Sequence, residues 1–75
     1  MKVKFSRHAK RRAKLYRIPE LTIRRILEAK NVEQGEYEFV ENVPGFNNPI
    51  KIIVIVEANS AIVVTNYPLK KGRIK

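Results

Sequence analysis

The sequence has 75 residues, room for one small domain, and its hydrophobic content of 44% predicts a folded core rather than a disordered basic chain. It contains one histidine and neither cysteine nor aspartate, which excludes disulfides, a thiolate nucleophile and a cysteine-rich zinc site. We therefore expect no metal and no cofactor. Because the N-terminus turns charged after Met1 and no apolar run could span a bilayer, we expect a cytoplasmic protein that does not bind membranes.

The net charge of +9 is unevenly distributed along the chain. Residues 1–30 contain eleven Lys and Arg against two Glu, for a charge of +9, residues 31–57 carry −4, and residues 58–75 carry +4. Clustered positive charge favours polyanions by counterion release and by steering association. We expect nucleic acid as the first partner and an acidic protein as the second. The abundance of Lys, Arg, Glu and Ile without Cys or Asp also indicates a thermophile.

The chain is expected to begin with a strand and a helix. Lys2–Phe5 alternates basic and apolar residues, which is typical of a short edge strand. Ser6 can cap the helix that follows, and this helix should end at about Tyr16, because the residue before Pro19 is disfavoured in a helix.

The two sides of this basic helix differ in chemistry. An apolar stripe is formed by Phe5, Ala9, Ala13 and Tyr16. His8 and Arg12 lie one turn apart on its flank. The opposite side is cationic and carries Arg7, Lys10, Arg11, Lys14 and Arg17. A lone helical histidine is more often structural than catalytic, and cations usually just face solvent, but no acid relieves this cluster.

The rest of the chain predicts one more helix and three strands. The helix spans about residues 19–30, with Pro19 at its first position and an apolar face that covers a sheet. Strands are expected at residues 36–43, 50–58 and 61–67. The loop at 43–49 carries Phe46, which either stacks on a base or folds back as an anchor. A basic tail begins at about residue 69.

This order of elements predicts one α+β domain over residues 1–75. A short N-terminal strand precedes two helices, which are expected to pack on one face of an antiparallel sheet. A three-strand meander is expected to close that sheet.

The side chains that remain available for chemistry are His, Arg, Lys, Tyr and Thr, a set suited to metal-independent RNA cleavage. In that reaction a ribose 2′-hydroxyl attacks the adjacent phosphodiester, with help from a base, a cation and an acid. His8 is the candidate base or acid, and Arg12 is the candidate phosphate clamp. Thr65 or Tyr67 would supply a hydroxyl at the end of the last strand.

Three short motifs resemble a family of small uncharacterised prokaryotic domains related to the RelE, ParE and BrnT toxins. They are His8-Ala9 followed by Arg12, the Arg17-Ile18 turn before the second helix, and the closing segment 61–68. The resemblance spans residues 5–68 and implies a RelE-like fold and an endoribonuclease. The motif residues that it marks are His8, Arg12, Thr65 and Tyr67. The family's interhelical glycine is missing from the turn at 16–19, and Pro19 replaces its capping Ser or Thr.

Three functions remain open from the sequence. The first is a toxin-type endoribonuclease that acts on RNA, free or on the ribosome, with an acidic antitoxin as a further partner. The second is a non-catalytic nucleic-acid-binding module, and the third is a toxin-fold protein-interaction domain. The oligomeric state is left open. The residues expected to contact nucleic acid are Arg7, Lys10, Arg11, Lys14, Arg17, Phe46, Lys70, Lys71 and Arg73.

Overall fold

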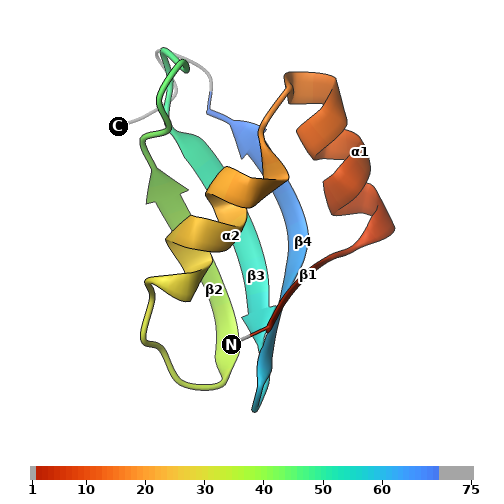
Figure 1. The fold of residues 1–75 in the computed structure, drawn as a ribbon, viewed down its shortest axis with the longest axis vertical. Helices are drawn as coiled ribbons and strands as arrows, with labels where there is room; N and C mark the ends of the chain where they lie inside the picture. The colour runs from red at the N-terminus through yellow and green to blue at the C-terminus, as the bar shows by residue number, and fades with distance from the viewer. Residues whose placement is uncertain (1, 70–75) are drawn as a thin grey trace.

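The computed structural model describes residues 2–69, which form an α+β domain of two helices and four strands (Figure 1). The predicted element types and their order are confirmed, and the bounds agree to within a few residues. In chain order the elements are β1 (Lys2–Phe5), α1 (Arg7–Tyr16), α2 (Glu20–Glu28), β2 (Gly35–Glu41), β3 (Ile50–Val56) and β4 (Ser60–Pro68).

The sheet is mixed, so the prediction of an antiparallel sheet was wrong. Its strand order is β1-β4-β3-β2, in which β1 runs parallel to β4 while β2–β3 and β3–β4 are antiparallel. After β1 the chain passes through both helices to β2 at the far edge. It then returns through β3 to β4, which pairs with β1. Parallel neighbours need such a long crossover, which the two helices and the β2–β3 hairpin supply here.

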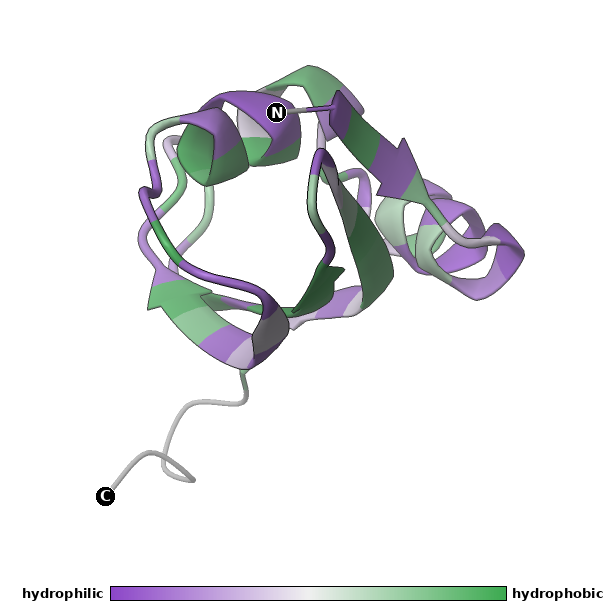
Figure 2. Cartoon of the chain, turned by 90° about the horizontal axis from the view of Figure 1, so that it is seen from below, coloured by the Kyte–Doolittle hydropathy of each residue, from purple (hydrophilic) through white to green (hydrophobic). Residues whose placement is uncertain are grey.

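Helix α1 lies beside β4 rather than over a face of the sheet. The four residues of β1 pair only with the first part of β4, which leaves the rest of β4 as an edge. α1 occupies this edge, where the Asn66 Nδ2 donates to the Ala9 carbonyl at 3.2 Å and the Ser6 Oγ donates to the Val64 carbonyl at 2.9 Å. Figure 2 shows α2 over the concave side of the sheet and α1 outside it. The prediction that both helices pack on one face was therefore wrong for α1.

The hydrophobic core lies between α2 and the concave face of the sheet. Ile23 and Leu27 of α2 are fully buried there. Burial of each such side chain contributes about 1.5–3 kcal/mol relative to exposure. Every second residue of β3 points into this core, namely Ile50, Ile52, Val54 and Val56.

The ends of α1 follow from its sequence. Ser6 caps the helix as predicted, because its side-chain oxygen accepts a hydrogen bond from the Ala9 backbone N–H at 3.0 Å. The helix ends at Tyr16, and Arg17 adopts the left-handed conformation with φ 57°. Pro19 directly precedes α2, so the helix begins one residue later than predicted. Within residues 2–69, neither helix is long and apolar enough to cross a membrane.

No helix covers the convex face of the sheet in the described part of the chain (Figure 2). This face presents Lys51, Ile53 and Ile55 of β3 between their buried neighbours. On β2 it presents Glu36 and Glu38, both of them exposed. Within residues 2–69 the side chains of this face are exposed or half-buried.

Candidate functional site

A hollow of about 420 Å³ opens on the convex face, where α1 flanks β4. The four residues proposed from the sequence as catalytic all line it, together with one residue at the end of α1 and one in β3. The lining residues are His8, Arg12, Tyr16, Ile53, Thr65 and Tyr67. The fold thus brings together side chains that lie more than fifty positions apart in the sequence, and we call this hollow the α1–β4 pocket.

The helical side of the pocket follows from residue spacing. His8, Arg12 and Tyr16 are four residues apart, so they lie on nearly the same face of α1. Ala9 and Ala13 are buried and set the rotation of the helix against β4. The neighbouring flank therefore faces the pocket, where His8 is exposed and the other two side chains are half-buried.

The strand side of the pocket depends on a β-bulge. Ile53 pairs with Thr65, but the next residue of β3, Val54, pairs with Val63, so Val64 is an extra residue in β4. Side chains alternate between the two faces of a regular strand, and one extra residue reverses the alternation beyond it. The bulge therefore turns Thr65 and Tyr67 toward the convex face, and without it they would point into the core.

A buried asparagine joins the two sides of the pocket. Asn66 is fully buried between the two pocket residues of β4, and its Nδ2 donates to the Ala9 carbonyl of α1. Its Oδ1 has no hydrogen-bond partner among the described residues. Asn66 was not among the residues predicted from the sequence, although a polar residue that strands disfavour, set in an apolar run, was the available signal.

Lys51 lies next to the pocket and was also missed. It pairs with Tyr67 across β3 and β4, and its Nζ contacts the Glu38 Oε1 at 2.9 Å. The hydrogen bond and the charge of Glu38, followed by the charge of Tyr67, raise the pKa of Lys51 above its ordinary value of 10.5. The available signal was that Lys51 is the one cation in the acidic stretch 31–57.

The remaining predicted contact residues divide into three groups. The first group is exposed, and the ion pairs within residues 2–69, Lys30–Glu41 and Lys51–Glu38, involve none of its members, which are Arg7, Lys10, Arg11, Lys14 and Arg17. Phe46 packs against the hydrophobic core, which favours the anchor over the base-stacking interpretation. The third group lies outside the described residues and consists of Lys70, Lys71 and Arg73.

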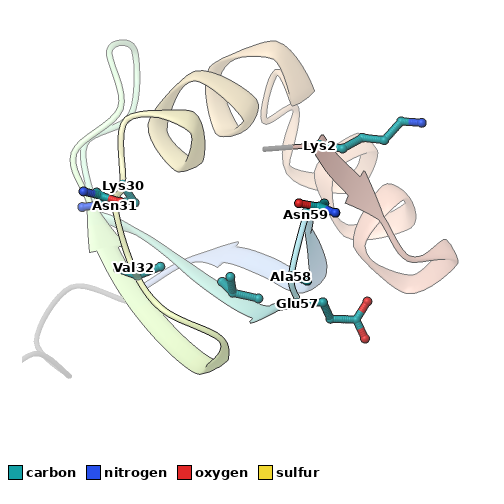
Figure 3. Close-up of a pocket in the computed structure, with 8 residues that line it drawn as sticks. Lys2, Lys30, Asn31, Val32, Glu57, Ala58 and Asn59 are labelled. Atoms are coloured by element: carbon teal, nitrogen blue, oxygen red, sulfur yellow. The ribbon is translucent and has the colours of Figure 1, made fainter.

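A second hollow, of about 340 Å³, lies at the other end of the sheet near the β3–β4 turn. Figure 3 shows the side chains of Lys2 and Glu57 pointing away from it. Lys30, a third charged residue of its lining, is engaged by Glu41 at 2.7 Å. Charged groups therefore do not converge in this hollow.

Within residues 2–69 no group of three or more His, Cys, Asp or Glu side chains is placed to hold a metal ion. The donors at the α1–β4 pocket are one imidazole, one guanidinium and hydroxyl groups. Such a set can exchange protons and bind phosphate oxygens. Comparisons of the chain with protein-family models, with curated proteins and with solved structures find no match.

Proposed function

We propose that this protein is a metal-independent endoribonuclease whose active site is the α1–β4 pocket, of the RelE-like toxin type or descended from one. The observation that carries the proposal is that His8, Arg12, Thr65 and Tyr67 line one pocket. A base, a phosphate-binding cation and a proton donor are the groups that ribose-assisted cleavage requires.

In the proposed reaction the ribose 2′-oxygen attacks the adjacent phosphorus. The bond from the 2′-oxygen to phosphorus forms, the bond from phosphorus to the 5′-oxygen breaks, and a 2′,3′-cyclic phosphate remains. His8 accepts the proton of the 2′-hydroxyl, and Tyr67 donates a proton to the leaving 5′-oxygen. Arg12, with a hydrogen bond from Thr65, stabilises the charge that develops on the phosphate oxygens.

The surroundings of the pocket also favour a polyanionic substrate. The cationic side of α1 is exposed beside the pocket, and no described ion pair involves it. A surface of this kind attracts the phosphate backbone whatever its base sequence. The same observation favours a second candidate function, a nucleic-acid-binding module without catalysis, in which the pocket only positions the strand.

The test is incubation with a labelled single-stranded RNA in the presence of a chelator, followed by analysis of the fragment ends. We expect wild-type protein to leave 2′,3′-cyclic phosphate ends. The His8→Ala variant should cleave about 10²–10⁴-fold more slowly, which is the usual contribution of a general base. Its affinity for the same RNA should change little, because phosphate contacts carry most of the affinity.

The matched control is Arg25→Ala, which changes an exposed residue of α2 that does not line the pocket. This variant should cleave like wild type. If wild-type protein binds RNA but leaves it intact, and His8→Ala binds equally well, the binding module replaces the nuclease. Cleavage that His8→Ala retains in full would remove His8 from the active site.

A further inference from the structure

We propose that Lys51 forms a second phosphate-binding subsite of the α1–β4 pocket, so that the ligand is a nucleic acid strand with at least two consecutive phosphates. This inference rests on the proposed function in taking RNA as the ligand and Arg12 as a phosphate-binding residue. Lys51 is not among the residues predicted from the sequence to bind or cleave RNA.

The placement of Lys51 follows from the register of β3 and β4. It lies directly opposite Tyr67 in the antiparallel β3–β4 pair, and Ile53, two residues further along β3, is in the lining of the pocket. Directly opposite residues carry their side chains on the same face, with Cβ atoms about 5 Å apart. Lys51 therefore stands at the rim of the pocket, beside Tyr67.

Arg12 and Lys51 lie on opposite sides of β4. Arg12 reaches the pocket from α1 on one side of β4, whereas Lys51 belongs to β3 on the other side. The two pocket residues of β4, Thr65 and Tyr67, lie between them. An RNA strand that crosses β4 at this point can place one phosphate on Arg12 and a neighbouring phosphate on Lys51. Each cation would then form a charge-assisted contact with one phosphate.

An ion pair with Glu38 holds the side chain of Lys51. Its side chain is 26% exposed, whereas that of its partner Glu38 is 60% exposed, so the lysine lies along the sheet and the glutamate stands in solvent. An exposed pair of this kind contributes little stability, but it holds the ammonium group near one position. Glu38 also competes with a phosphate for that group. Removing Glu38 should therefore strengthen phosphate binding, and removing Lys51 should weaken it.

The test measures both effects on the affinity for one ligand. The ligand is a fluorescent 2′-O-methyl hexaribonucleotide, which cannot undergo attack by a 2′-hydroxyl, so affinity is measured apart from cleavage. We expect Lys51→Gln to weaken binding by about tenfold or more, which is the loss typical of one charge-assisted contact. Lys51→Arg should restore most of the affinity. We expect Glu38→Gln to tighten binding about twofold.

A purely structural role for the ion pair predicts that both variants change affinity in the same direction, because each breaks the same contact. Arg25→Gln removes one positive charge from α2 and controls for net charge. A second series replaces one phosphodiester at a time with an uncharged methylphosphonate. Wild-type protein should lose affinity when either of two neighbouring phosphodiesters is replaced. The affinity of Lys51→Gln should be unaffected by the replacement at one of these two linkages.

The outcomes separate this inference from the proposed function. If wild-type protein cleaves RNA while Lys51→Gln binds the hexanucleotide as wild type does, the second subsite is wrong and the nuclease stands. If RNA stays intact while Lys51→Gln weakens and Glu38→Gln tightens binding, the subsite stands and the nuclease is wrong. Equal losses in both variants would also overturn the subsite.

Discussion

Among single residues, Asn66 connects the helix of the α1–β4 pocket to its strand. We expect this contact to contribute to the stability of the fold. The Asn66 Nδ2 donates to the Ala9 carbonyl from a fully buried position. In Asn66→Asp a carboxylate would replace the donor and face that carbonyl without a partner. We expect a loss of about 3 kcal/mol at pH 7, because a buried unpaired charge costs more than a lost neutral hydrogen bond. Urea unfolding measures the loss.

Two comparisons isolate this effect. Asn42→Asp adds the same charge at an exposed position and should leave stability nearly unchanged. Asn66→Leu removes the donor and the unpartnered Oδ1 together, so it should cost much less than Asn66→Asp. Because burial disfavours the charged carboxylate, the deficit of Asn66→Asp should shrink as the pH falls toward 4. A deficit independent of pH would contradict this explanation.

At the scale of elements, the turn between α1 and α2 carries a local strain that can be measured. Arg17 has φ 57°, a conformation that is unfavourable for residues with a side chain and that glycine adopts freely. Arg17→Gly should therefore raise the free energy of unfolding by about 0.5–1 kcal/mol and Tm by about 4 °C. Arg25→Gly, inside α2, should lower that free energy by about 1 kcal/mol. Calorimetry that finds both variants destabilised would contradict the expectation.

The helices and strands could be predicted because their signals are local. Ser6 and Pro19 mark helix boundaries through their own backbone chemistry, and the β-branched run at 50–56 excludes a helix without reference to the rest of the fold. The left-handed residue at Arg17 could not be predicted, because arginine carries no preference for that conformation. The tertiary path of the chain imposes it: the Ile18 backbone N–H bonds back to the Ala13 carbonyl at 2.8 Å, and the Ile18 side chain is buried.

At the scale of the whole molecule, the partner of β1 and the arrangement of the pocket depend on long-range pairing. The alternation in Lys2–Phe5 indicates a strand, but nothing in it selects β4 as a parallel neighbour. The bulge at Val64 also has no local signature, yet it turns Thr65 and Tyr67 toward the convex face. The motif therefore predicted which residues meet in the pocket, while the register that brings them there came from the structure. Lys51 was missed for the same reason, because only the register places it beside Tyr67.

The charge distribution of the folded molecule predicts how RNA binding depends on salt concentration. The cationic side of α1 and the acidic outer residues of β2 lie at opposite sides of the sheet, so only one side should attract a polyanion. For single strands, the logarithm of the binding constant falls with the logarithm of salt concentration by about 0.7 per neutralised phosphate. Lys10→Gln combined with Lys14→Gln should therefore reduce the slope by about 1.4.

Measurement of RNA affinity between about 50 and 200 mM salt, the range over which such contacts weaken strongly, gives this slope. Arg25→Gln changes the charge of α2 by one unit and should leave the slope unchanged, because α2 lies over the concave face, away from the pocket. An equal reduction for Arg25→Gln would mean that net charge, rather than the α1 surface, attracts the RNA. An unchanged slope in the double variant would remove Lys10 and Lys14 from the contact surface, and the strand would then have to approach the pocket across β3, where Lys51 is the nearest cation.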